Sequence, residues 1–273
     1  MFGKDALQEL IKSGHVPEFL KALENTNTQS QLVLIPENYD LRDLEKYQEF
    51  RNNLRGSFDT NLISELTSYT KDHAVEGSKT FVDADEMKAT TIFDIGTNDK
   101  AGHQVHRARC ALKKTAPFKA LLGLDGTRKD QRDLAEFLED WAEYFQAFSS
   151  AGEKLEFHKA VAAIRDLDYE HVRGSNKQVN DFSQAQSEYE RMATKTKDDL
   201  VLPAAFVFTC EPYHGLKARN FELRLSIVRN EVLVLRIKRL EEAEEKMALE
   251  FLDTVKSSFA SAKVTMPIYI GNF

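Results

Sequence analysis

Two separate zones of alternating sequence constrain the fold of this chain more than any other feature. In the first zone, residues 80–112, short apolar and β-branched runs flank a glycine-containing turn at 96–102. In the second zone, residues 202–240, three further runs alternate apolar and polar side chains. A period of two is typical of strands with one buried face. Helical patterns lie before, between and after these zones, so we predict an α+β fold with antiparallel sheets in two zones and helices packed on one face.

The residue patterns also predict the individual elements. Strands are expected over residues 31–35, 80–82, 89–95, 103–112, 202–210, 220–228, 231–240 and 266–270, with a hairpin across Arg229–Asn230. Helices are expected over 4–24 and 40–50, from Asp59 through Tyr69, from Asp130 through Phe148, and over 153–164 and 241–261. Residues 166–196 fit both helical and strand spacing.

The length of 273 residues is sufficient for a substantial core without disulfides or metal ions. We expect a mainly helical N-terminal region over 1–75 and an α+β body over 76–273, with one continuous domain as the alternative. Cys110 and Cys210 lack CxxC spacing, which indicates neither a disulfide framework nor a zinc site. No run of 18 apolar residues occurs and the first 25 residues are rich in charge, so we expect no membrane span, no secretory signal and a cytoplasmic location.

The net charge of −7 is unevenly distributed. Residues 100–132 hold nine Lys or Arg against two acids, a balance of +7, and residues 217–239 hold seven against two, a balance of +5. Removing this +12 leaves −19 for the rest of the chain. Such segregation indicates either a surface for phosphates or contact with acidic surfaces inside the fold or on a second subunit. An acidic stretch directly follows each basic one, which favours the second interpretation.

The basic strands are the strongest candidates for a binding surface. Arg107 and Arg109 share one face of a strand, because residues two apart point the same way, and two lysines continue the stripe. The residues expected to bind are His106, Arg107, Arg109, Lys113, Lys114, Arg224, Arg236 and Lys238. Nucleic acid is one expected partner, although aromatic residues near the stripes are few (Phe118, Tyr213 and Phe221) and the pI of about 5.6 argues against a dedicated nucleic-acid binder.

An enzymatic alternative rests on the string Asp94-Ile95-Gly96-Thr97. An Asp at a strand end followed by Gly and Thr occurs where sugar kinases and actin hold phosphate and metal, so Asp94, Gly96 and Thr97 are the alternative phosphate-binding residues, with Arg107 assisting. Sugar kinases and actin need a second loop of the same kind. The most similar string in this chain, Leu124–Thr127, lacks a preceding apolar strand. An ordinary turn explains both strings better, because Asp, Gly and Thr are favoured there.

Other kinds of catalytic or metal site are not indicated. His103 and His106 are three apart on an expected strand and so point to opposite faces, which argues against a shared metal ion. No Gly-x-Ser-x-Gly motif occurs. The sequence therefore predicts no catalytic residue, no metal and no cofactor, and leans against an enzyme without excluding one.

Several short strings resemble a known family. The stretch Leu34–Glu45 is similar to an N-terminal signature of the YfdQ-like family of phage and prophage proteins. His106-Arg107-Ala108, Thr115–Ala120 and Leu134–Asp140 resemble its central block, and Leu202-Pro203 with Pro212–Gly215 resembles its C-terminal block. The resemblance implies a phage or prophage setting in a bacterial host cell. It carries over no catalytic residue, because the family has no assigned function.

These observations lead to three functional hypotheses. The first is a non-enzymatic, self-associating phage or prophage accessory protein that binds a phage or host protein, or nucleic acid, through its basic strands. The second is a phosphate- or nucleotide-handling enzyme that uses the Asp94–Thr97 turn. The third is a protein that sequesters a host defence factor or a signalling nucleotide.

Overall fold

A computed structural model of the chain describes residues 49–51, 53–167, 200–228 and 232–273. The contacts divide the chain into two units, Met1–Asn53 and Leu54–Phe273. The second unit includes strand β1 (Gly56–Thr60) and helix α3 (Ile63–His73), which lie within the range 1–75 predicted as the N-terminal region. The strand expected at 31–35, nearly all of both helices expected before residue 50, and the ambiguous stretch from 168 onward lie outside the described residues, as does the turn of the expected hairpin.

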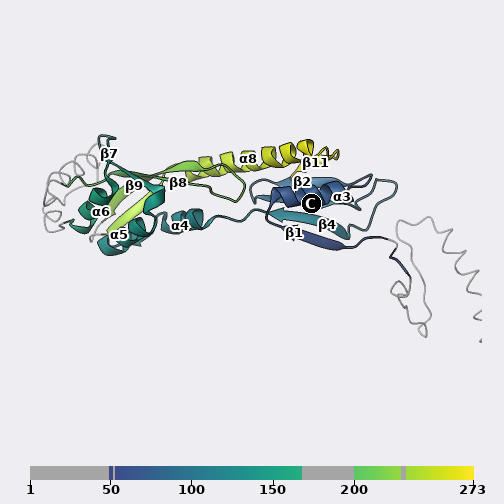
Figure 1. The fold of residues 1–273 in the computed structure, drawn as a ribbon, viewed down its shortest axis with the longest axis horizontal. Helices are drawn as coiled ribbons and strands as arrows, with labels where there is room; N and C mark the ends of the chain where they lie inside the picture. The colour runs from purple at the N-terminus through teal and green to yellow at the C-terminus, as the bar shows by residue number, and fades with distance from the viewer. Residues whose placement is uncertain (1–48, 52, 168–199, 229–231) are drawn as a thin grey trace, which may run out of the picture. The chain divides into compact units, whose positions relative to one another are not determined.

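The first sheet has five strands in the order β1-β4-β3-β2-β11. Their bounds are β1 Gly56–Thr60, β4 His106–Ala111, β3 Lys88–Ile92, β2 Lys79–Asp83 and β11 Ile268–Ile270. The three central strands are antiparallel, whereas the edge strands β1 and β11 run parallel to their neighbours. Helix α3 (Ile63–His73) lies against one face of this sheet (Figure 1). It packs there through Leu66 and Thr70, which are fully buried.

The second sheet has six antiparallel strands in the order β5-β10-β9-β8-β6-β7. Their bounds are β5 Arg128–Lys129, β10 Val232–Ile237, β9 Arg219–Val228, β8 Ala205–Cys210, β6 Phe145–Phe148 and β7 Lys154–Leu155. Helices α5 (Gln131–Asp140) and α6 (Phe157–Arg165) cover one face of this sheet. Phe145 shows this directly, because its ring contacts Phe137 of α5 and Phe157 of α6. Phe118 of helix α4 (Ala116–Leu124) stacks on Phe221 of β9.

The long helix α8 (Leu240–Ser261) contacts elements of both halves of the body. Glu250, near its middle, forms an ion pair with Arg219 of β9, and Ser258, near its end, lies 2.7 Å from the Thr67 hydroxyl of α3. Met247, Phe251, Val255 and Phe259 recur every four residues and are all buried, as an amphipathic helix requires. Among the described residues no helix is both long enough and apolar enough to cross a membrane.

The predicted α+β class with two mainly antiparallel sheets is confirmed. Strands β2, β3, β4, β8, β9, β10 and β11 and helices α3, α6 and α8 lie where patterns indicated them. The helix from Asp130 was predicted too long, since α5 ends at Asp140 and a 3-10 turn, η2 (Ala142–Tyr144), leads into β6. The predicted cap of α3 was also wrong: Asp59 lies in β1, and the Thr60 hydroxyl accepts from the Leu62 N–H. Both cysteines are free and buried.

Candidate functional site

Strand β4 separates its two sets of side chains as the alternating sequence predicted. His106, Ala108 and Cys110 are buried on the face that α3 covers, whereas Arg109 is exposed and Arg107 half-buried on the other face. The register of the neighbouring strands then fixes which residues accompany the two arginines.

We call this second face of the first sheet the open face. Its members stand opposite one another along the ladder: Ser57, Asp59, Lys79, Phe81, Asp83, Lys88, Thr90, Arg107, Arg109, Ala111 and Tyr269. All of these residues are exposed or half-exposed within the described part of the chain. Ile92 lies on the same face but is buried. Four cations and two carboxylates leave the open face with a balance of +2, although the whole chain carries −7. The face is therefore locally cationic and attracts anions.

An aromatic stack occupies the β2-β11 side of the open face. The Phe81 ring stacks on Tyr269, with ring centroids 5.5 Å apart and planes inclined by 22°, and on Phe273, at 4.5 Å and 26°. Tyr269 is 47% exposed and Phe273 is 56% exposed. Stacked rings that remain exposed present faces on which another planar ring can stack.

One row across the sheet brings the cationic and aromatic parts together. Asp59, Arg109, Thr90, Phe81 and Tyr269 stand directly opposite one another on five consecutive strands. Since adjacent strands lie about 4.8 Å apart, the backbone at Arg109 is about 10 Å from that at Phe81. A guanidinium and a stacking surface therefore lie within reach of a single flexible anion with planar groups.

The cations of the open face differ in how far they are already engaged. Arg107 donates from Nε to the Gln104 carbonyl at 2.8 Å, and Lys88 pairs with Glu86 at 3.1 Å. Arg109 and Lys79 form no ion pair with any residue that the structure describes. Of these two cations, Arg109 is exposed whereas Lys79 is half-buried, so Arg109 is the better placed to meet an anion.

The structure corrects the assignment of His106 to the binding surface. Its ring is buried beneath α3, on the opposite side of the sheet from Arg107 and Arg109. Nε2 lies 3.0 Å from the Tyr69 hydroxyl, and the His73 ring lies 5.4 Å away. Burial, assisted by the neighbouring His73 and opposed by Asp94, holds the pKa of His106 below its usual value.

The Asp94–Thr97 turn uses its polar groups to organise its own loop. The Asp94 carboxylate accepts from the backbone N–H groups of Val105 and His106, at 2.9 and 3.0 Å. Thr97 donates its N–H to the Lys100 carbonyl and accepts from the Lys100 N–H. Gly96 adopts φ +72, and a Cβ there would collide with the Lys100 carbonyl oxygen. These contacts support the interpretation as a turn.

The remaining predicted residues lie elsewhere in the body. Lys113 and Lys114 follow β4 in the connection to α4, where Lys114 pairs with Tyr213 in an isolated bridge. Arg224 and Arg236 stand opposite each other on the second sheet, and Lys238 pairs with Glu222 at 3.4 Å. The basic residues thus divide between the two sheets.

The aromatic part of the open face was not predicted from the sequence. Phe81 precedes Tyr269 by almost the whole length of the body, and only the parallel pairing of β2 with β11 joins them. The aromatic residues singled out near the basic stripes serve the core instead: Phe118 and Phe221 are buried and stack on each other. The period-two pattern of β2 could have placed Phe81 beside Lys79, but not beside Tyr269.

The described residues include no group of three His, Cys, Asp or Glu side chains that could hold a metal ion. No curated protein and no solved structure gave a match to the chain. A family model for an uncharacterized conserved protein, DUF2303, matches residues 7–273, and because this is nearly the whole chain, the protein belongs to the DUF2303 family.

Proposed function

We propose that the protein binds single-stranded nucleic acid on the open face of its first sheet. The observation that carries the proposal is the row in which Arg109 stands two strands from the Phe81–Tyr269 stack. Single strands are bound by cations that follow the phosphates and by aromatic rings on which unpaired bases stack. Both components lie on one exposed surface here.

A single strand fits this surface better than a duplex does. The bases of a duplex stack on each other, and their edges are reached by a helix or a two-stranded ribbon that enters a groove. The open face is the flank of a five-stranded sheet, whose exposed rings need unstacked bases. A protein surface with acidic groups would satisfy the cations but would leave the aromatic stack without a role.

The proposal extends the expected role as a non-enzymatic accessory protein. The resemblance to YfdQ-like proteins supports a phage or prophage setting, in which single strands arise during replication and recombination, and a cytoplasmic location. The enzymatic alternative has less support, because both Asp94 oxygens already accept backbone hydrogen bonds. The third hypothesis, capture of a signalling nucleotide, predicts binding of mononucleotides rather than of a strand.

The first test measures fluorescence anisotropy of labelled oligo-dT and oligo-U about ten nucleotides long, with a duplex of equal length and free nucleotides for comparison. We expect Tyr269→Ala to weaken single-strand binding roughly 5- to 150-fold, because stacking contributes about 1 to 3 kcal/mol per base. Leu249→Ala is the matched control, since Leu249 is 63% exposed on α8, away from the open face.

The second test uses salt. Arg109→Ala should reduce the slope of log K against log salt by about 0.7, because one phosphate contact to a single strand is lost. Lys119→Ala on α4 removes an exposed cation elsewhere and should leave the slope unchanged. Equal affinity of wild type and Tyr269→Ala, or tighter binding of duplex than of single strand, would contradict the proposal.

A further inference from the structure

We propose that the second sheet mediates head-to-tail association of identical chains, with its uncovered basic face docking on the acidic outer surface of α5 in the next copy. The proposal concerns a different surface from the open face of the first sheet, so either can fail without the other. Its basis is the placement of opposite charges on opposite sides of one sheet.

The basic face is the side of the second sheet that the helices of the described ranges leave uncovered. Its central row consists of Arg236, Arg224, Ala205, Phe148 and Lys154, each opposite the next on five adjacent strands. Arg128 of β5 and Lys238 lie on the same side, and Glu222 is the acid among them. Five cations against one carboxylate give the basic face a balance of +4.

Arg224 and Arg236 are the strongest sign that this face meets an anionic partner. They stand directly opposite each other on β9 and β10, and both are exposed. Like charges in this position are about 5 Å apart at Cβ and destabilise a sheet. Neither forms an ion pair with any residue in the described ranges. A carboxylate-bearing surface placed over the pair would remove this repulsion.

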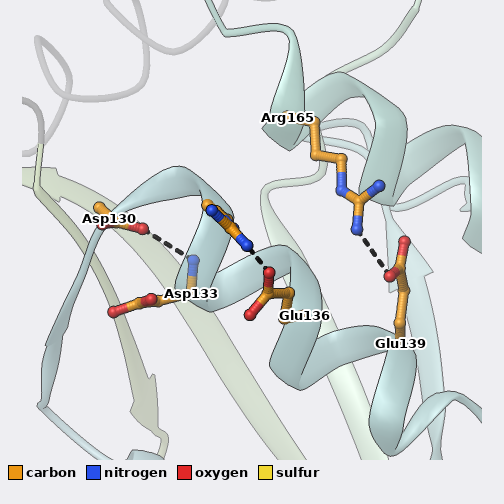
Figure 2. A network of polar contacts seen from close by, with 6 residues as sticks. Asp130, Asp133, Glu136, Glu139 and Arg165 are labelled. Atoms are coloured by element: carbon orange, nitrogen blue, oxygen red, sulfur yellow. Dashed lines mark hydrogen bonds and ion pairs between the residues drawn. The ribbon is translucent and has the colours of Figure 1, made fainter.

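The acidic surface lies on the other side of the same sheet. Helix α5 buries Leu134, Ala135 and Leu138 and exposes its acids. Asp133, Glu136 and Asp140, at offsets of 0, 3 and 7, share one helix face. Figure 2 shows Asp133, Glu136 and Glu139 along the helix, with Arg165 reaching Glu139 at 2.7 Å. Together with Glu143, these four acids of α5 make five exposed carboxylates. The nearby cations are Arg132 and Arg165, so the charge balance of this surface is −3.

Two complementary surfaces on opposite sides of one sheet favour a heterologous contact. The basic face of one copy meets α5 of the next. An open chain of copies leaves one basic face and one acidic surface free at its ends, and a ring forms where these two surfaces meet. The six strands span only about 24 Å, so the contact is small and rests on charge. We therefore expect weak association that salt reverses.

The experiment is sedimentation velocity of the full chain, from low to about 100 μM concentration, in low and high salt. Wild type should form species larger than a dimer at low salt and a monomer at high salt. Arg224→Glu with Arg236→Glu should prevent association, as should Asp133→Lys with Asp140→Lys. The quadruple variant exchanges the charges of these two residue pairs alone and restores the net charge of the chain. It should associate again, because the two pairs lie against each other in the proposed contact.

Controls separate this contact from other effects of charge. Lys88→Glu with Arg109→Glu changes the net charge by the same −4 on the open face of the first sheet, and should leave association unchanged while it abolishes single-strand binding. Circular dichroism checks that each variant is folded. A wild-type monomer at low salt and 100 μM, or a quadruple variant that stays monomeric, would overturn the proposal. Loss of oligonucleotide binding in the Arg224 and Arg236 variant, with association unchanged, would assign the face to nucleic acid instead.

Discussion

At the scale of the residue, His106 is a histidine buried among aromatic rings. Its imidazole is buried among Tyr69, His73 and Phe93, and the Asp94 carboxylate is held beside its backbone N–H. Because His73 is itself a base, a proton on either ring disfavours a proton on the other. This packing favours a neutral His106.

This environment predicts a dependence of stability on pH. Burial holds the pKa of His106 in the folded protein below 6.5, so the unfolded chain binds its proton more readily. The contribution of His106 to stability is complete above about pH 6.5 and decreases as the pH falls below that value. Urea unfolding at pH 7 and pH 5 should show a larger loss of unfolding free energy for wild type than for His106→Gln, which has no group to titrate there.

A different, exposed carboxylate, that of Glu76, supplies the control for this prediction. Glu76 is exposed three residues beyond the end of α3, and Glu76→Gln removes an exposed charge from the same part of the chain. It should retain the pH difference of wild type. An equal loss of stability on acidification in wild type and His106→Gln would show that the buried imidazole is not the group responsible.

At the scale of the element, α8 is attached to the second sheet by a half-buried ion pair. Arg219 of β9 donates to Glu250, and the same carboxylate accepts from the Lys217 N–H at 2.8 Å. The two side chains are only 21% and 18% exposed. The Arg219 guanidinium also donates to the Ala243 carbonyl at 3.5 Å, but Glu250 is its carboxylate partner and the acceptor for the Lys217 N–H.

We expect Glu250→Ala to lower the free energy of unfolding by about 2 to 3 kcal/mol, because it leaves the half-buried Arg219 guanidinium without its carboxylate. Thermal and urea unfolding measure this loss. Glu245→Ala is the matched control, since Glu245 is exposed on the same helix and should change stability by less than about 0.5 kcal/mol. A similar effect of the two variants would mean that the Arg219 pair is not important for attachment of α8.

The elements also show how far a sequence determines such a fold. The strands of the second zone and helix α8 were predicted because their apolar spacing is regular and reflects burial on one side. Helix α5 was extended wrongly because Phe145 and Phe148 continue its helical spacing, although β6 gains its backbone partners from β8, which lies about 60 residues later. Strand β1 was missed because Gly56–Thr60 has little apolar character and is placed by its parallel pairing with β4.

The same distinction applies to the candidate site. The alternation of β4 predicted that Arg107 and Arg109 share a face, since this depends only on neighbours in the chain. The row that joins Arg109 to Phe81 and Tyr269 depends on the order of five strands, which local pattern does not encode. Half of the site was therefore predictable, and the aromatic half required the topology.

At the scale of the whole molecule, the segregated charge predicts behaviour that the net charge of −7 conceals. We expect the protein to bind to heparin at low salt despite its pI of about 5.6, because each sheet presents a separate cationic face. The pairs Lys88→Glu with Arg109→Glu, and Arg224→Glu with Arg236→Glu, should each lower the salt needed for elution. Their effects should add, since the sites are on different sheets.

Chromatography on heparin at fixed pH measures the eluting salt for wild type and the two pairs. Asp133→Lys with Asp140→Lys is the reference for a change of net charge in the opposite direction. If either pair of reversals alone abolished retention, the two faces would not bind independently.

The pairing of β2 with β11 determines when, during synthesis, the open face can be completed. The antiparallel strands β2, β3 and β4 are complete once residue 111 has left the ribosome, and they can form their sheet early. Strand β11 is synthesised more than 150 residues later, and pairing over such a separation is slow. A nascent chain therefore carries the arginines of the open face long before Tyr269 and Phe273 complete its aromatic stack. Translation itself therefore delays the proposed binding surface until β11 has been made.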